Sequence, residues 1–151
     1  MDAKDWIPIA ISALSLLVSA YTLYMQHRQN KECLKVKLST GFTASHGHVS
    51  ETMLLAEAAN IGGRSVTVSS YGLQMPNNKV LVFPFRGQHV KLPHELLPGK
   101  SCTMVMPIQE VARALLEDGH TEVKLILQFS AQSGEKFSAK PYKFNAQAWA
   151  K

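Results

Sequence analysis

The sequence predicts a mostly β protein, with an N-terminal transmembrane helix followed by an antiparallel β-sandwich that carries one short inserted helix at about 108–118. Two observations carry this prediction: residues 6–26 contain no charged side chain, and residues 33–144 alternate between short apolar stretches and turn residues. The chain has 151 residues, of which 46% are hydrophobic and 18% charged. It therefore fits one compact domain with an appendage and is too apolar to be disordered.

The uncharged stretch has the length and the ends of a membrane span. At about 1.5 Å per residue, the 21 residues of 6–26 form a helix of roughly 30 Å, the thickness of the hydrocarbon layer. Pro8 falls in the first turn, where its missing N–H has no helical partner. Trp6 lies at one end and Tyr21 and Tyr24 at the other, where aromatic rings prefer the headgroup boundary. We expect a tail at 1–5, a transmembrane helix at 6–26 and a connector at 27–32.

A cleaved signal peptide at 1–20, followed by an exported domain, is the alternative. The small residues at 18–20 resemble those that precede a cleavage site. Export signals begin with net positive charge, however, whereas Lys4 here stands against Asp2 and Asp5. The apolar stretch also continues past residue 20, which favours a retained span.

The basic residues near this helix predict its orientation. Lys4 is the only one before the helix, while Arg28, Lys31, Lys35 and Lys37 follow it. The positive-inside rule then gives a single-pass protein of the inner (plasma) membrane, with its N-terminus outside and its domain in the cytoplasm. We expect the four basic residues after the helix to contact anionic lipid headgroups.

The polar residues of the span fall on one face. They are Ser12, Ser15, Ser19, Thr22 and Gln26, at spacings of three, four, three and four. Small polar side chains let helices approach closely in lipid, although Ser and Thr also bond carbonyls of their own helix. This stripe predicts helix–helix association, either as a homo-oligomer or with another membrane protein.

The β elements are expected in a regular order. Leu34, Val36 and Leu38 alternate with polar residues, as in a half-buried strand. A polar loop at 41–50 precedes the second strand, and Pro84 marks the fourth as an edge strand. Residues 62–65 are interpreted as a hairpin turn. The predicted strands are 34–39, 51–60, 65–73, 80–85, 101–106, 121–130 and 136–144.

The inserted helix and the last hairpin have clear local signals. After Pro107, the helix presents Val111, Ala114 and Leu115 as apolar residues and stops at Gly119. Apolar residues alternate along 121–130, and Ser133-Gly134 predicts a hairpin turn into 136–144. Residues 33–144 thus form the predicted domain, and 145–151 a C-terminal tail.

The runs AANIGGRSVTVSSYGL and LLPGKSCTMVMPI resemble the immunoglobulin-like sandwiches of bacterial surface and membrane proteins. One N-terminal helix followed by such a sandwich is similar to the layout of a group of small uncharacterised bacterial membrane proteins. The resemblance covers most of residues 35–144 and rests on turn chemistry. It implies an immunoglobulin-like fold, and no activity or catalytic residue.

The residues give no basis for an enzyme, a cofactor or a metal site. His46 with His48, and His89 with His94, each offer only two ligands. Neither a Gly-x-Ser-x-Gly elbow nor a phosphate-binding Gly-rich motif occurs. The net charge of +5 is accounted for beside the membrane, and the chain lacks the interleaved basic and aromatic residues of a nucleic-acid surface. Cys33 and Cys102 suit a reducing compartment, although in an exported domain they could form a disulfide.

Two functions are therefore expected. In the first, the domain is a non-enzymatic module that binds a protein partner at the membrane surface. Its candidate contact residues are Phe83, Phe85, Arg86, His89 and His94. In the second, the chain is an accessory subunit of a larger membrane complex for transport, secretion or phage exclusion, assembled through the polar stripe.

Overall fold

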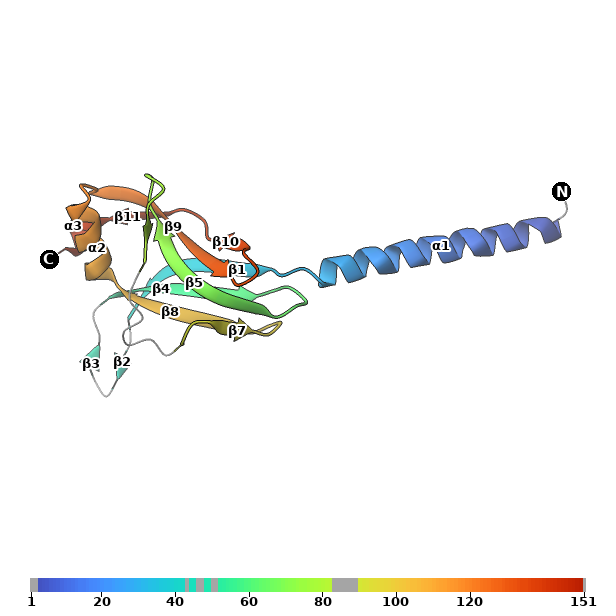
Figure 1. Cartoon of the computed structure of the whole chain (residues 1–151), viewed down its shortest axis with the longest axis horizontal. Helices are drawn as coiled ribbons and strands as arrows, with labels where there is room; N and C mark the ends of the chain where they lie inside the picture. The colour runs from blue at the N-terminus through green and yellow to red at the C-terminus, as the bar shows by residue number, and fades with distance from the viewer. Residues whose placement is uncertain (1–2, 43, 46–47, 50–51, 83–89, 151) are drawn as a thin grey trace.

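The computed structural model describes residues 3–42, 44–45, 48–49, 52–82 and 90–150. Helix α1 (Ala3–Gln29) projects as a rod from a body of β-strands (Figure 1). Helices α2 (Ile108–Glu117) and α3 (Ala146–Trp149) lie at the opposite end of that body. We call the turns at 61–65, 97–100 and 132–135 the near end of the domain, and α2, α3 and the turn at 75–79 the far end.

One antiparallel sheet has three strands in the order β1-β4-β8. These are β1 (Leu34–Gly41), β4 (Met53–Asn60) and β8 (Ser101–Pro107). Leu34 pairs with Asn60, and Ala58 with Cys102. Alternate residues of β4 and β8 are buried, as expected for a sheet with one face in a core.

The second sheet has the order β10-β9-β5-β6, and β7 pairs with β5 while β11 pairs with β9. Its strands are β5 (Val66–Gln74), β6 (Val80–Leu81), β7 (His94–Leu96), β9 (Glu122–Ala131), β10 (Lys136–Ser138) and β11 (Tyr142–Asn145). Two further strands, β2 (Ala44–Ser45) and β3 (His48–Val49), pair within the predicted loop 41–50. The prediction of a mostly β chain with antiparallel sheets is confirmed.

Both sheets contribute to one hydrophobic core. Leu54 and Met104 come from the first sheet, Leu73 and Leu127 from the second, and all four are fully buried. The rings of Tyr71 and Phe129 stack with centroids 5.7 Å apart. Burial of these side chains is the main stabilising contribution to the domain.

Helix α2 confirms the predicted inserted helix. Ile108, Val111, Ala112 and Leu115 are buried at positions i, i+3, i+4 and i+7, which form one helix face. Ala112 lies on that face, whereas Ala114 is only half-buried. The helix is followed by Gly119, whose φ of 83° is the left-handed conformation that favours glycine.

Two predictions for the strands are wrong. The predicted strand 136–144 is divided into β10 and β11, because Pro141 has no N–H to donate to β9. Residues 62–65 are not a hairpin turn, since they lead from β4 in the first sheet to β5 in the second. The tail also contains an unexpected helix, α3, whose first turn is capped by the Asn145 side chain accepting from the N–H of Ala148.

Candidate interaction surfaces

Helix α1 carries its apolar side chains on the outside of the molecule. Residues 6–27 form a 22-residue apolar segment, and none of it is buried against the domain. Leu16, for example, is 71% exposed. At about 1.5 Å per residue the segment is roughly 33 Å long, enough to cross a bilayer. Within this chain the helix is thus not part of the core, and it could span a membrane.

The predicted polar stripe is bonded within its own helix. The hydroxyls of Ser12, Ser15, Ser19 and Thr22 each donate to the carbonyl four residues earlier, at 2.7–2.9 Å. The hydroxyl protons are thus already donated within the helix. Any helix–helix association along this face would therefore be stabilised mainly by the close packing of small side chains. Association through the stripe, Gln26 included, stays a prediction.

The joint between α1 and β1 is packed tightly against the near end. A Cβ added to Gly63 would collide with the carbonyl oxygen of Gln29, and one added to Gly62 would collide with the carbonyl oxygen of Lys31 and lie 2.8 Å from the Cys33 nitrogen. The amides of Ile61 and Gly62 both donate to the Cys33 carbonyl, at 3.0 and 3.2 Å. The helix end is therefore held by backbone packing that only glycine permits.

A second contact holds the connector from the other side. The hydroxyl of Ser133, in the turn between β9 and β10, donates to Glu32 at 2.6 Å. The β4–β5 and β9–β10 turns, which are far apart in the sequence, thus both contact residues 29–33. The domain is fixed to the helix by a short joint instead of hanging from a flexible linker.

The buried side chain of Asn60 hydrogen-bonds to several backbone groups of the near end. It is 1% exposed, and its amide nitrogen donates to the carbonyls of Arg64 and Leu96 at 2.7 and 2.8 Å. Its side-chain oxygen accepts from the Gly62 amide at 2.9 Å. The Asn60 backbone also pairs with Gly99 and Lys100. A single buried side chain thus joins the β4–β5 and β7–β8 turns, a role that its position at the end of a predicted strand does not reveal.

A basic groove runs between β1 and the segment that joins β10 to β11. It has a volume of about 560 Å³, and its lining includes Lys35, Lys37 and Lys140 around apolar residues such as Val36 and Tyr142. No acidic residue lines it in the described part of the chain. In the described part of the chain, one edge of β1 pairs with β4 and no strand pairs with the other edge of β1.

Two of the four residues predicted to contact lipid headgroups line this groove. Lys35 and Lys37 lie on β1 beside the groove, whereas Lys31 is exposed at the joint. The side chain of Arg28 is not among those that the structure describes. Sequence reasoning missed Lys140 and Tyr142, because their nearness to β1 depends on how the two sheets pack.

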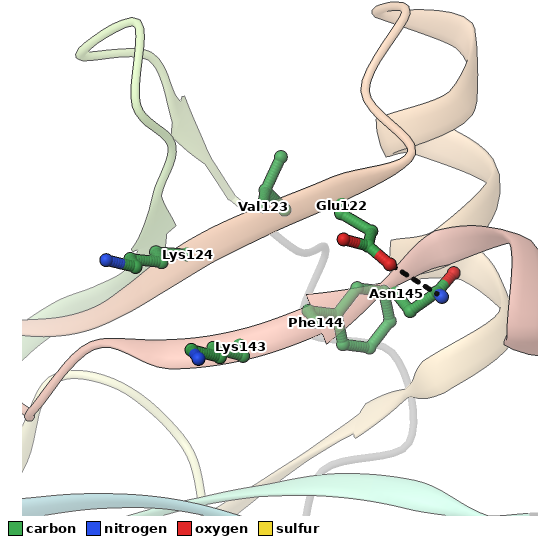
Figure 2. A pocket seen from close by; sticks show the side chains of 6 residues that line it. All are labelled: Glu122, Val123, Lys124, Lys143, Phe144 and Asn145. Atoms are coloured by element: carbon green, nitrogen blue, oxygen red, sulfur yellow. Dashed lines mark hydrogen bonds between the residues drawn. The ribbon is translucent and has the colours of Figure 1, made fainter.

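A second depression lies at the far end, where β9 extends beyond its pairing with β5. Figure 2 shows Glu122 and Asn145 joined across β9 and β11, and the distance from Glu122 Oε1 to Asn145 Nδ2 is 3.3 Å. Lys124 and Lys143 are paired in register on the same two strands. The volume is about 360 Å³, and the single carboxylate in its lining is already hydrogen-bonded, so the depression shows no assembled ligand site.

Most of the predicted partner contacts lie outside the described residues. Phe83, Phe85, Arg86 and His89 fall there, as does His46 of the first histidine pair. His94 is half-buried at the start of β7, where it pairs with Val68. In the described ranges no group of three or more His, Cys, Asp or Glu side chains is arranged to hold a metal ion.

The two cysteines are free thiols in different surroundings. Cys33 is half-buried at the joint, and Cys102 is buried in the core. Burial raises the pKa of the Cys102 thiol above its usual value, so this group stays protonated and unreactive at neutral pH.

No family model and no curated protein matches this chain. Among solved structures, it is similar to a structural genomics target designated SoR45, with 14% identity and a TM-score of 0.32 over 74% of this chain and 86% of that chain. A structural genomics target from Bordetella pertussis described as ApaA gives 13% identity and a TM-score of 0.30, over 75% and 91% of the two chains. Similarities this low carry no argument about fold or function.

Proposed function

We propose that this chain is a single-pass protein of the inner (plasma) membrane whose cytoplasmic domain is a non-enzymatic module that binds a protein partner at the membrane surface. The observation that carries the proposal is the fixed joint between an apolar helix that is not buried against the domain and a β domain with a basic groove. An anchored domain meets only partners that come to the membrane, which raises their effective concentration. The excess of basic residues after the helix supports the cytoplasmic placement.

We further propose that the domain is an immunoglobulin-like sandwich. Strand order supports this: β1-β4-β8 corresponds to strands A, B and E of such a domain, and β10-β9-β5 to strands G, F and C. Each strand in these two sets is antiparallel to its neighbour.

The groove beside β1 favours an acidic, extended segment as the bound part of the partner. Three lysines with no carboxylate among the described lining residues attract negative charge. Lysines along an edge strand also discourage unspecific strand pairing. A segment that carries Asp or Glu would neutralise Lys35, Lys37 and Lys140 while its apolar residues cover Val36 and Tyr142.

Orientation is tested by maleimide labelling of Cys33 in intact and in lysed cells, with any outer membrane permeabilised. The proposal expects labelling only after lysis. Labelling in intact cells would place the domain outside and contradict it. A disulfide between Cys33 and Cys102 is not an expected outcome in either location, because β4 lies between β1 and the strand of Cys102.

Partner binding is tested by a photo-crosslinking residue at Tyr142 in growing cells. We expect a discrete adduct that disappears in Lys35→Glu/Lys140→Glu. The matched control, Lys124→Glu/Lys143→Glu at the far end, removes the same charge and should leave the adduct intact. An adduct that is insensitive to the groove variant would contradict this binding surface.

The polar face of α1 supports a second proposal, an accessory subunit that assembles with a larger membrane complex. Its support is the row of small residues whose hydroxyls are already bonded within the helix, which leaves a face suited to close packing. Ser15→Leu/Ser19→Leu should abolish that assembly, whereas the first proposal expects the Tyr142 adduct to persist in the same variant.

A further inference from the structure

The near end of the domain lies close to the last turn of α1. The β4–β5 turn sits against the carbonyl of Gln29, only two residues beyond the apolar segment that ends at His27. Two residues of helix add about 3 Å, and the headgroup region on each side of the hydrocarbon layer is roughly 5–7 Å thick. If α1 spans the membrane as proposed above, the β4–β5 turn lies within the headgroup region.

The residues exposed there combine apolar and basic side chains. Ile61 is 63% exposed and Leu97 is 53% exposed, although the preceding residues Asn60 and Leu96 are each 1% exposed. Arg64 and Lys100 are exposed in the same two turns. Apolar side chains flanked by cations are typical of a surface that enters the interface of an anionic membrane.

The two turns are held as one surface. The Asn60 side chain bonds the carbonyls of Arg64 and Leu96, and its backbone bonds Gly99 and Lys100. In Figure 1 both the β4–β5 turn and the turn after β7 face α1. Neither apolar side chain can therefore move away from the membrane without the other.

Three acidic residues adjoin these turns without belonging to them, and they are Glu32 at the joint, Glu95 on β7 and Glu135 between β9 and β10. Glu32 accepts from the Ser133 hydroxyl, and Glu135 belongs to the same β9–β10 turn. The β4–β5 and β7–β8 turns contain no acidic residue. The charged side chains within the two turns that expose Ile61 and Leu97 are therefore the cations Arg64 and Lys100.

We propose that the β4–β5 and β7–β8 turns form a lipid-contact surface, in which Ile61 and Leu97 enter the headgroup region and Arg64 and Lys100 bind the phosphates of anionic lipids. The proposal rests on the membrane span of α1 and adds a second point of contact. With two contacts the domain has a defined tilt on the membrane. Ile61 also lines the basic groove, so this tilt places one end of the groove at the membrane surface.

The test places an environment-sensitive fluorophore on single cysteines in the full chain, reconstituted in vesicles. The cysteines replace Ile61 or Leu97, in a Cys33→Ser background in which Cys102 is buried. Vesicles contain phosphatidylcholine alone or with phosphatidylglycerol, and a nitroxide on the headgroup quenches any nearby fluorophore. A fluorophore at position 147, at the far end, provides the distant control. A fluorophore at position 15, combined with a lipid that carries its nitroxide deep in the acyl chain, reports whether α1 spans the bilayer.

We expect strong headgroup quenching at 61 and 97 in anionic vesicles and none at 147. Arg64→Glu/Lys100→Glu should reduce the quenching at 61 and 97 to the level at 147, whereas Lys124→Glu/Lys143→Glu should leave it unchanged. Deep quenching at 15 with none at 61 or 97 would overturn this inference and leave the membrane anchor standing. No quenching at 15 would overturn the anchor and this surface together. Equal quenching in both vesicle types, insensitive to charge reversal, would overturn the role given to Arg64 and Lys100.

Discussion

The two ends of the β domain are held together by different interactions. At the near end, a buried asparagine and close backbone packing at two glycines fix the turns around the end of α1. At the far end, α2 covers the core with a row of apolar side chains. Apolar contacts tolerate small shifts, whereas hydrogen bonds and backbone contacts do not. The difference suits their positions, because only the near end has to hold the domain at a set angle to the helix.

The strongest test of the apolar far end is Leu115→Ala. Leu115 is fully buried, and this truncation should lower the free energy of unfolding by about 2–5 kcal/mol through the lost burial and the cavity it leaves. Urea unfolding is followed by maleimide labelling of Cys102 in a Cys33→Ser background, which reports the core and not α1. Arg113→Ala, on the exposed face of the same helix, should change stability by no more than about 0.5 kcal/mol. Equal effects of the two variants would contradict the apolar basis of the far end.

Asn60→Ala tests the polar near end. It removes the donor for two carbonyls and the acceptor for the Gly62 amide, so we expect a loss of about 2–3 kcal/mol in the same assay. Hydrogen exchange should accelerate at the amides of Ile61 and Gly99 and stay slow at Asp118. The control Asn77→Ala changes an exposed asparagine of the far end. Uniformly faster exchange would mean that Asn60 supports the whole core and not the near end.

Gly63→Ala should disturb the joint more than the domain. The added Cβ collides with the backbone of Gln29, at a cost of about 1–3 kcal/mol if the two cannot separate. We expect the β4–β5 turn and the end of α1 to separate. The distribution of distances between spin labels at Leu23 and Thr103 should then broaden. At Gly41 an added Cβ meets only the Leu55 side chain, which can move, so Gly41→Ala serves as the matched control. An unchanged distance distribution in Gly63→Ala would contradict the fixed joint.

The smallest expected effect concerns an ion pair of the far end. Lys79 Nζ lies 2.6 Å from Asp118 Oδ1, and this hydrogen bond lowers the pKa of the Asp118 carboxyl below its usual value. A lowered pKa in the folded state stabilises the fold above the unfolded-state pKa, and the gain is lost as pH falls through the folded value. Asp118→Asn should therefore be slightly less stable than wild type at neutral pH and equal to it in strong acid.

The exposed setting of this pair keeps the effect small, because water screens it. Unfolding at several pH values measures it, with Glu117→Gln as the neighbouring control. A difference that grows as pH falls would contradict the assigned direction.

Local patterns in the sequence were sufficient for the elements whose signals repeat along the chain. The uncharged stretch predicted α1, the apolar spacing after Pro107 predicted α2, and alternation predicted the burial of Val123 and Phe129 on β9. The last strand was predicted less well, since Pro141 divides it and the helix that follows has only four residues.

The candidate surfaces depended on contacts that no local pattern encodes. Asn60 was predicted as the last residue of a strand, and nothing near it in the sequence indicates its hydrogen-bond partner Leu96, which lies 36 residues away. Lys140 reaches the groove only because the β10–β11 segment packs beside β1.

The sequence by itself determined that the chain has one long apolar helix and a β-rich domain, because hydrophobic periodicity acts over neighbouring residues. Only the tertiary structure decided that Ile61 and Leu97 share one end beside that helix, and that three lysines line one groove. Such placements arise when two sheets pack around a common core, and they join residues that the sequence keeps far apart.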